Sequence, residues 1–295
     1  MQQESIYITE GEEQLHLRHI WQSKGGVPIF MLHGLIENGF IFYTEKGKGL
    51  ACYLAGQGFD VYVADLRGRG KSLPAINSQS TFGQHETITC DIALFLEKIQ
   101  SINPQKMHLI AHSWGGVLIS SFLARYPNWL DKVHSKTCFG TKRVVTAKTM
   151  EAYFKLGFMW RYIAPILAKK NGYFDAKKFR FGSDSETKKS LEESITWVIP
   201  GKWHDLNDGF DYYTAAQNIT WPPTWHLTGI SDYALGHQQD VQLFIDECNN
   251  RNAKFSVLSK QAGNQVNYDH INILTHPNTV NDHFPKLALW LKGFS

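Results

Sequence analysis

Short apolar runs alternate with longer amphipathic stretches along most of the chain. Residues 27–32, 60–64 and 106–111 are strand-length runs, whereas apolar residues recur at helical spacing over 87–102. This alternation is typical of a mostly parallel sheet covered by helices. Further strands are expected at 5–9, 14–20, 132–139, 223–228 and 254–258, and further helices at 44–56, 114–126 and 277–291.

The alternation of strand-length runs and helical stretches stops between residues 144 and 218. Helical patterns such as 150–167, which Pro165 interrupts, occur there without a clear strand. A segment inserted between two strands of a sheet lies at one end of that sheet. We therefore expect a core made of residues 1–143 and 219–295, with residues 144–218 forming a helical cap, or lid, over it.

One short motif carries a clear chemical signal, Ala111-His112-Ser113-Trp114-Gly115. It lies where a predicted strand turns directly into a predicted helix, and the small residues two positions before and after Ser113 let the two elements approach closely. Such a turn exposes the serine hydroxyl, and the free N–H groups of the following helix favour developing negative charge. The alternative is an ordinary tight connection between a strand and a helix. His112 is expected only to pack locally beside the serine.

These residues resemble the α/β-hydrolase fold superfamily over nearly the whole chain. The motif at 111–115 is similar to the family's nucleophile elbow G-x-S-x-G, with Ala111 in place of the first glycine, and residues 65–72 resemble its D-x-R-G-x-G-x-S turn. The resemblance implies a mostly parallel eight-stranded α/β-hydrolase sheet with helices on both faces and an inserted cap. It also implies an oxyanion hole formed by the backbone N–H groups of Leu35, after His33-Gly34, and of Trp114.

A nucleophilic serine needs a histidine base and an acid that orients the histidine. Because the family order is serine, acid, histidine, the resemblance implies Asp232 and His270 as partners of Ser113. The alternatives are Asp240 and Asp269 for the acid, and His276 and His283 for the base. Of these, Asp240 is expected to cap a helix and His283 to lie on a helix surface.

The function that this site implies is hydrolysis of a carboxylic ester through an acyl-enzyme, as in carboxylesterases and lipases. A serine at the elbow argues against dehalogenases and epoxide hydrolases of this fold, which use aspartate there. An acyltransferase or thioesterase, a carbon–carbon bond hydrolase and a non-catalytic ligand receptor remain open alternatives. A mostly apolar small-molecule ester is expected, in contact with His33, Gly34, Phe154, Phe158 and Trp160.

Composition limits the partners, cofactors and location that we expect for the protein. The 30 basic and 27 acidic residues are scattered, so no basic stripe indicates a nucleic-acid partner. The four cysteines form no metal-binding spacing, and neither a metal nor an organic cofactor is implied. Because no secretory signal and no apolar run of about 18 residues is found, we expect a cytoplasmic protein without stable membrane insertion. The sequence does not indicate an oligomeric state.

Overall fold

The core of the molecule is a single large sheet of mostly parallel strands. The computed structural model describes residues 1–295, apart from the side chain of Lys155. The sheet has eight strands in the order β1-β2-β4-β3-β5-β6-β9-β10. Strand β2 pairs antiparallel with β1 and β4, and the other neighbours are parallel, which confirms the predicted sheet. The strands are β1 Gln2–Glu10, β2 Glu13–Trp21, β3 Pro28–Leu32, β4 Asp60–Asp65, β5 Met107–His112, β6 Val133–Phe139, β9 Thr224–Gly229 and β10 Lys254–Leu258.

Both faces of the sheet are buried because its central strands are apolar at successive positions. In β3, Phe30 and Leu32 belong to one apolar cluster and Ile29 and Met31 to another. Alternate residues of a strand point to opposite faces, so a continuous apolar run needs helices on both sides.

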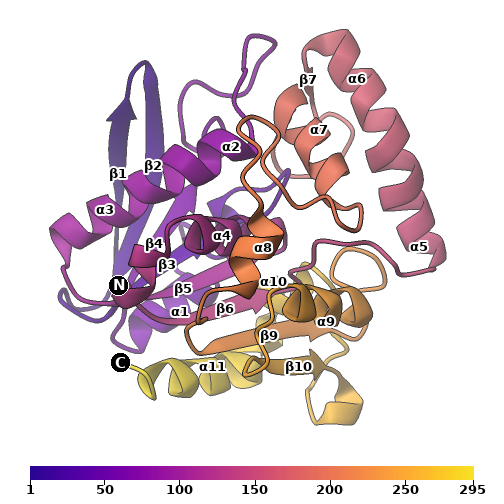
Figure 1. Cartoon of the computed structure of the whole chain (residues 1–295). Helices are drawn as coiled ribbons and strands as arrows, with labels where there is room; N and C mark the ends of the chain where they lie inside the picture. Colours follow the sequence, from indigo (N-terminus) through magenta and orange to yellow (C-terminus); the bar gives the residue numbers. More distant parts are fainter.

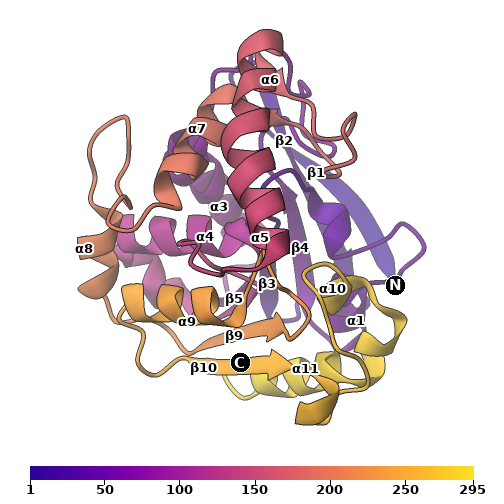
Figure 2. The same ribbon diagram turned by 90° about the vertical axis from the view of Figure 1, so that its right-hand side faces the viewer.

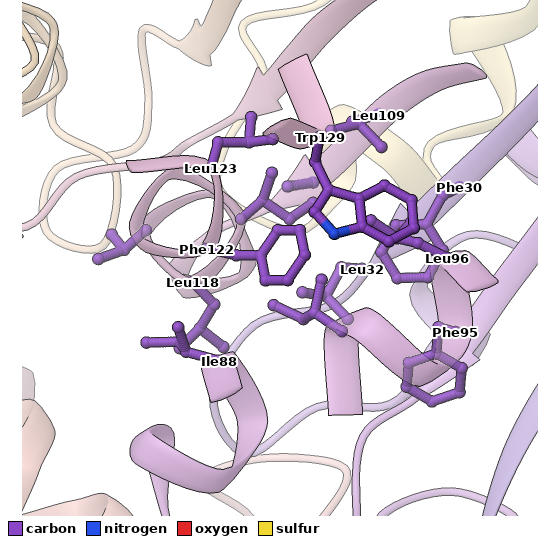
Figure 3. Packing of buried hydrophobic residues seen from close by; sticks show 14 of the residues in the cluster. Phe30, Leu32, Ile88, Phe95, Leu96, Leu109, Leu118, Phe122, Leu123 and Trp129 are labelled. Carbon is purple, nitrogen blue, oxygen red and sulfur yellow. The ribbon is translucent and has the colours of Figure 1, made fainter. Parts of the chain in front are cut away.

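Helices supply that cover. The first cluster includes α3 (Ile92–Ile102) and α4 (Trp114–Arg125), and Figure 3 shows their side chains interleaved with those of β3 and β5. The second cluster includes α1 (Leu50–Gly56) and α11 (His283–Lys292). The remaining core elements are η1 Gly39–Ile41, α2 Gln84–Glu86, η2 Thr87–Asp91, η3 Pro127–Lys132, α9 Gln238–Glu247, η5 Lys260–Ala262, α10 Asn272–Thr275 and η6 Pro277–Asn281.

One helix differs from the sequence prediction. The expected helix over 277–291 is divided into η6 and α11 at Asp282, whose φ of −120° and ψ of −86° are not helical. The Asp282 carboxylate accepts hydrogen bonds from the Asn264 side chain, the Gln265 N–H and the Tyr268 hydroxyl. These contacts hold Asp282 in a conformation that interrupts the helix.

Residues 144–218 form a segment between β6 and β9. Its first half is a rod made of α5 (Met150–Ala152), the π-helical η4 (Tyr153–Ile163) and α6 (Ala164–Asn171). Pro165 is the second residue of α6 and does not end the rod. The rod stands away from the sheet, and α7 (Lys188–Trp197) lies between it and α2 (Figures 1 and 2).

The rest of this segment is less uniform than predicted. Where no strand was expected, β7 (Tyr173–Phe174) and β8 (Glu186–Thr187) form a two-residue ladder. The last helix, α8 (Tyr212–Gln217), packs on the same apolar cluster as α4. No described helix is both long enough and apolar enough to cross a membrane.

Candidate active site

Ser113 occupies the sharp turn between β5 and α4. Its φ of 52° lies in the left-handed region, which is unfavourable for a residue with a side chain. The turn also requires close packing: a Cβ on Gly115 would lie 2.5 Å from the His33 carbonyl oxygen. Ala111, which replaces the usual first glycine, is fully buried in β5 and its methyl group is accommodated there. The local geometry therefore presents the Ser113 hydroxyl in the manner that the motif predicts.

A chain of two hydrogen bonds connects Ser113 to an acid. His270 Nε2 lies 2.9 Å from Ser113 Oγ, and His270 Nδ1 lies 2.6 Å from Asp232 Oδ2. A carboxylate only accepts, so Nδ1 carries the proton and Nε2 is free to accept from the serine. Burial would raise the pKa of Asp232, but the charge and hydrogen bond of His270 outweigh burial and lower it. The acid therefore stays ionised beside the imidazole.

The competing acids and bases have structural roles. Asp240 accepts from the N–H and hydroxyl of Thr146, and Asp269 accepts from N–H groups at the start of α10. His276 caps η6, and the buried His283 donates to the Ile273 carbonyl. The structure therefore brings together Ser113, Asp232 and His270, which lie far apart in sequence. It also corrects the expectation that His283 lies at the surface.

The loop after β3 is oriented by His33. Its Nε2 accepts from the Leu66 N–H at 3.0 Å, so its Nδ1 donates to the Gly34 carbonyl at 2.8 Å. In a trans peptide the carbonyl and the next N–H point in opposite directions. The Leu35 N–H therefore points away from His33, and among the described residues it has no acceptor.

The position of this loop suits two oxyanion donors. A Cβ on Gly34 would lie 2.8 Å from Ser113 Cβ, so the loop passes directly beside the serine. Trp114 begins α4, where the first N–H groups of a helix have no intrahelical acceptor. Leu35 and Trp114 therefore offer free N–H groups on elements that flank the serine. His33 itself is completely buried with both ring nitrogens engaged, so it positions the loop and does not contact a substrate.

A cavity of about 630 Å³ opens beside Ser113 and His270. Its wall is mostly apolar and includes Leu35, Ile41, Leu156, Trp160 and Phe181. Phe154 and Phe158, which were expected to contact substrate, are 60% and 51% exposed and are absent from the described lining. They lie four residues apart on the outer face of the rod, whereas Leu156 and Trp160 lie on its inner face.

Comparison with known proteins identifies the fold family of the chain. A family model described as the alpha/beta hydrolase fold matches residues 27–247, which is most of the chain. The chain belongs to the alpha/beta hydrolase fold family. The prediction of this fold is thereby confirmed.

Two relatives of this chain are matched only in part. A probable lysophospholipase L2 of Haemophilus influenzae is 29% identical over 120 residues, which are 40% of this chain and 37% of the relative. Triacylglycerol lipase 1 of Arabidopsis thaliana is 28% identical over 102 residues, which are 32% of this chain and 26% of the relative. This chain therefore covers less than half of either relative's length.

Two solved structures are matched over nearly their whole length. A soluble variant of monoglyceride lipase from Saccharomyces cerevisiae has a TM-score of 0.70 and 18% identity, covering 100% of this chain and 97% of that chain. An esterase from Thermogutta terrifontis has a TM-score of 0.63 and 16% identity, covering 100% and 99%. At these identities the likeness shows a shared fold.

A second acid–histidine pair, Glu37 and His112, contacts the backbone of His270. Glu37 Oε2 lies 2.8 Å from His112 Nδ1 and accepts from the Gly34 N–H at 3.1 Å, while His112 Nε2 lies 2.9 Å from the His270 carbonyl oxygen. Burial would raise the pKa of Glu37, but His112 lowers it to about 2. Burial would likewise lower the pKa of His112, but Glu37 raises it. The pair therefore links the loop after β3 to the backbone of the histidine.

Among the described residues, two clusters have a spacing that could hold a metal ion, Glu37–His112–His270 and His85–Asp205–Asp208. In the first, the hydrogen bonds described above occupy every ring nitrogen. In the second, Arg125 contacts both aspartates. Neither donor set fits a cation, because the lone pairs or the charge are already used.

Residues 182–187 attach the inserted segment to the loop after β3. The Asp184 N–H donates to the Ile36 carbonyl at 2.9 Å, and its carboxylate accepts from the Asn38 side chain at 2.9 Å and the Gly70 N–H at 2.7 Å. Glu186 forms a buried ion pair with Arg69. These contacts join the segment firmly to the core beside Ser113.

Sequence reasoning missed the polar groups around the serine. Glu37, Lys142 and Asp184 were not identified because no motif marks them, and His112 was expected only to pack. Their neighbours are distant in sequence: Glu37 contacts His112, 75 residues away, and Asp184 contacts Asn38, 146 residues away. The sequence held one weak, local signal for Glu37, namely an acidic residue four positions after His33.

Proposed function

We propose that this protein is a serine hydrolase that cleaves a carboxylic ester through an acyl-enzyme. The observation that carries the proposal is the hydrogen-bonded chain Ser113–His270–Asp232 at the wall of a mostly apolar cavity. A hydroxyl, a base and an orienting acid in this arrangement are what nucleophilic acyl transfer requires.

In the proposed mechanism Ser113 Oγ attacks the ester carbonyl while His270 Nε2 takes its proton. The negative charge that develops on the carbonyl oxygen is stabilised by the N–H groups of Leu35 and Trp114, a contribution of about 3 kcal/mol per donor in related sites. His270 then protonates the departing alcohol. Water deprotonated by His270 attacks the acyl-enzyme and releases the acid, while Asp232 stabilises the imidazolium.

The substrate class that we propose is an ester with an apolar acyl chain. The mostly apolar lining of the cavity supports this, and its volume lies in the range of small-molecule sites. The names of the similar proteins, a lysophospholipase and lipases, also support an ester with an apolar acyl chain. We propose that residues 144–218 act as a cap, in which Leu156, Trp160 and Phe181 enclose the acyl chain.

The test is hydrolysis of p-nitrophenyl esters from acetyl to long acyl chains, comparing wild type with Ser113→Ala. We expect the wild type to hydrolyse at least one ester, and kcat to fall by about 10³-fold or more in the variant because the nucleophile is lost. Ser101→Ala, at an exposed position in α3, is the matched control and keeps wild-type activity.

Two outcomes would contradict the proposal. Ester hydrolysis that survives in Ser113→Ala would remove this serine from the mechanism. Wild-type protein that leaves every ester intact but acts on acyl thioesters, or on a vinylogous diketone, would reassign the same three residues to thioester or carbon–carbon bond cleavage.

A further inference from the structure

A buried lysine lines the cavity without a hydrogen-bond partner. Lys142 is 6% exposed and follows β6, and among the described residues no acceptor lies within hydrogen-bond distance of its Nζ. Its ion-pair partner, Asp240 Oδ2, is 4.0 Å away. An ammonium group with little exposure to water is unfavourable unless it is paired and hydrogen-bonded. A ligand that entered the cavity would supply the missing acceptors.

The charge of this lysine is retained at neutral pH. Burial lowers the pKa of Lys142 to about 8, and the nearby carboxylates of Asp240 and Asp232 limit the decrease. Near pH 7 most molecules therefore carry the ammonium cation. The cavity thus holds a positive charge that is only loosely neutralised.

The other charged groups that line the cavity do not neutralise the positive charge of Lys142. Glu37 is an acidic residue of the lining, and its carboxylate is already bound to His112 and the Gly34 N–H. Arg180 also lines the cavity, is exposed, and has no ion-pair partner within the described part of the chain. A ligand would therefore meet two cations without close partners and a carboxylate that is already engaged.

Lys142 and the proposed oxyanion donor Leu35 follow strands that lie on opposite sides of the strand that ends at the serine. Strand β5, which ends at the serine, lies between β3 and β6 in the sheet. Leu35 follows β3, whereas Lys142 follows β6. The lysine would therefore meet a part of the substrate other than the carbonyl oxygen.

We propose that Lys142 binds an anionic oxygen group, a carboxylate or a phosphate, carried by the ester substrate, and that Arg180 at the cavity wall assists its capture. Such a group would give Nζ the charge-assisted hydrogen bonds that it lacks. The proposal rests on the proposed ester hydrolysis and narrows its substrate to amphiphilic esters with one anionic group near the bond that is cleaved.

The test compares charged esters with neutral esters of similar shape. One pair is mono-p-nitrophenyl succinate and p-nitrophenyl pentanoate; the other is decanoyl lysophosphatidate and monodecanoylglycerol. We expect wild type to favour the charged member of at least one pair in kcat/KM, and Lys142→Met to reduce that preference by about 10–100-fold. The pair that shows the effect distinguishes a carboxylate from a phosphate.

Matched variants separate this role from a general effect of charge. Lys260→Met removes the same charge from an exposed site in η5 and keeps the wild-type preference. Lys142→Arg retains the charge and keeps part of the preference. Should Lys142→Met fail to fold, Lys142→Gln replaces it, and the wild-type preference is measured without any substitution.

The outcomes separate the two proposals. No wild-type preference within either pair, or the same preference in Lys142→Met, would overturn the role of Lys142 while ester hydrolysis still stood. If no ester is cleaved, the proposed function fails, and calorimetry of the Ser113→Ala variant with succinate and glycerol phosphate still tests the lysine. Binding that Lys142→Met abolishes supports the anion site, and an absence of binding overturns it.

Discussion

At the scale of single residues, the protonation of His112 follows from its neighbours. Its Nδ1 faces the Glu37 carboxylate and its Nε2 faces the His270 carbonyl oxygen, and both of these groups only accept hydrogen bonds. Both ring nitrogens must therefore donate, so His112 is an imidazolium paired with Glu37. This agrees with the raised pKa of the histidine and the lowered pKa of the acid. We interpret the pair as positioning residues for His270.

Removing the acid tests this interpretation. In Glu37→Ala, His112 loses its counter-charge and the Gly34 N–H loses its acceptor, so we expect kcat to fall by about 10–100-fold, with a smaller change in KM. Glu37→Gln keeps an acceptor oxygen and should recover part of kcat. The measurement is steady-state kinetics on a neutral ester, together with the melting temperature.

The matched control for this experiment is Glu192→Gln, because Glu192 is an exposed acid in α7. If kcat in Glu37→Ala equals that of the control, the pair has no positioning role. If kcat falls only in proportion to the loss of folded protein, the pair is merely structural.

At the scale of elements, the loop after β3 is held in an unfavourable conformation by the inserted segment. Ile36 has a φ of 52°, which a β-branched residue rarely adopts. Its carbonyl accepts from the Asp184 N–H, and a Cβ on Gly182 would lie 2.5 Å from the same oxygen. The segment therefore fixes the loop that carries the Leu35 N–H, and this part of it is not free to move as a lid.

Loss of the Asp184 carboxylate should loosen this junction. Asp184→Ala leaves the Asn38 side chain and the Gly70 N–H without an acceptor, at a cost of about 1–3 kcal/mol in the free energy of unfolding. We expect faster amide hydrogen exchange over residues 34–38 and a lower kcat. Lys177→Met is the control, because this lysine pairs with Asp184 from a side chain that is 56% exposed and should contribute little. Unchanged exchange in this loop would contradict the argument.

The strands and helices also show which parts of the structure could be predicted from the sequence. All eight strands and the turn at Ser113 follow from local patterns, because a buried parallel strand and a strand–helix turn have distinct sequence signals. The two-residue ladder of β7 and β8 and the break at Asp282 have no such signal, because each depends on contacts with other segments. For the same reason the aromatic residues of the rod could be predicted as helical, but not which of them face the cavity.

At the scale of the whole molecule, buried neutral histidines connect stability to pH. Burial lowers the pKa of His108 and His226 to about 3, and that of His283 to about 4. They lie in β5, β9 and α11, and so are distributed over much of the core. In the unfolded chain each returns to an ordinary value of 6.5 and binds a proton that the folded chain excludes.

The free energy of unfolding should therefore decrease as the pH falls below about 6.5, because the unfolded state then binds more protons than the folded state. The decrease should continue to about pH 4, at a slope of about 1.4 kcal/mol per pH unit for each proton taken up. Carboxylates whose pKa is lowered add to the decrease as the pH falls through their ordinary values, which are 4.5 for Glu37 and 3.8 for Asp232. Urea unfolding measured across this range gives the slope directly.

His226 allows a sharp test of this linkage. It is 1% exposed, and within the described residues its Nδ1 has no hydrogen-bond partner. His226→Leu should therefore reduce the proton uptake on unfolding by up to one and flatten the slope by about 1.4 kcal/mol per pH unit. Phe244→Leu alters the packing against the same ring without removing a titratable group, so it should lower stability equally at every pH. An identical slope in His226→Leu and wild type would show that this histidine is not the neutral group that the core excludes from protonation.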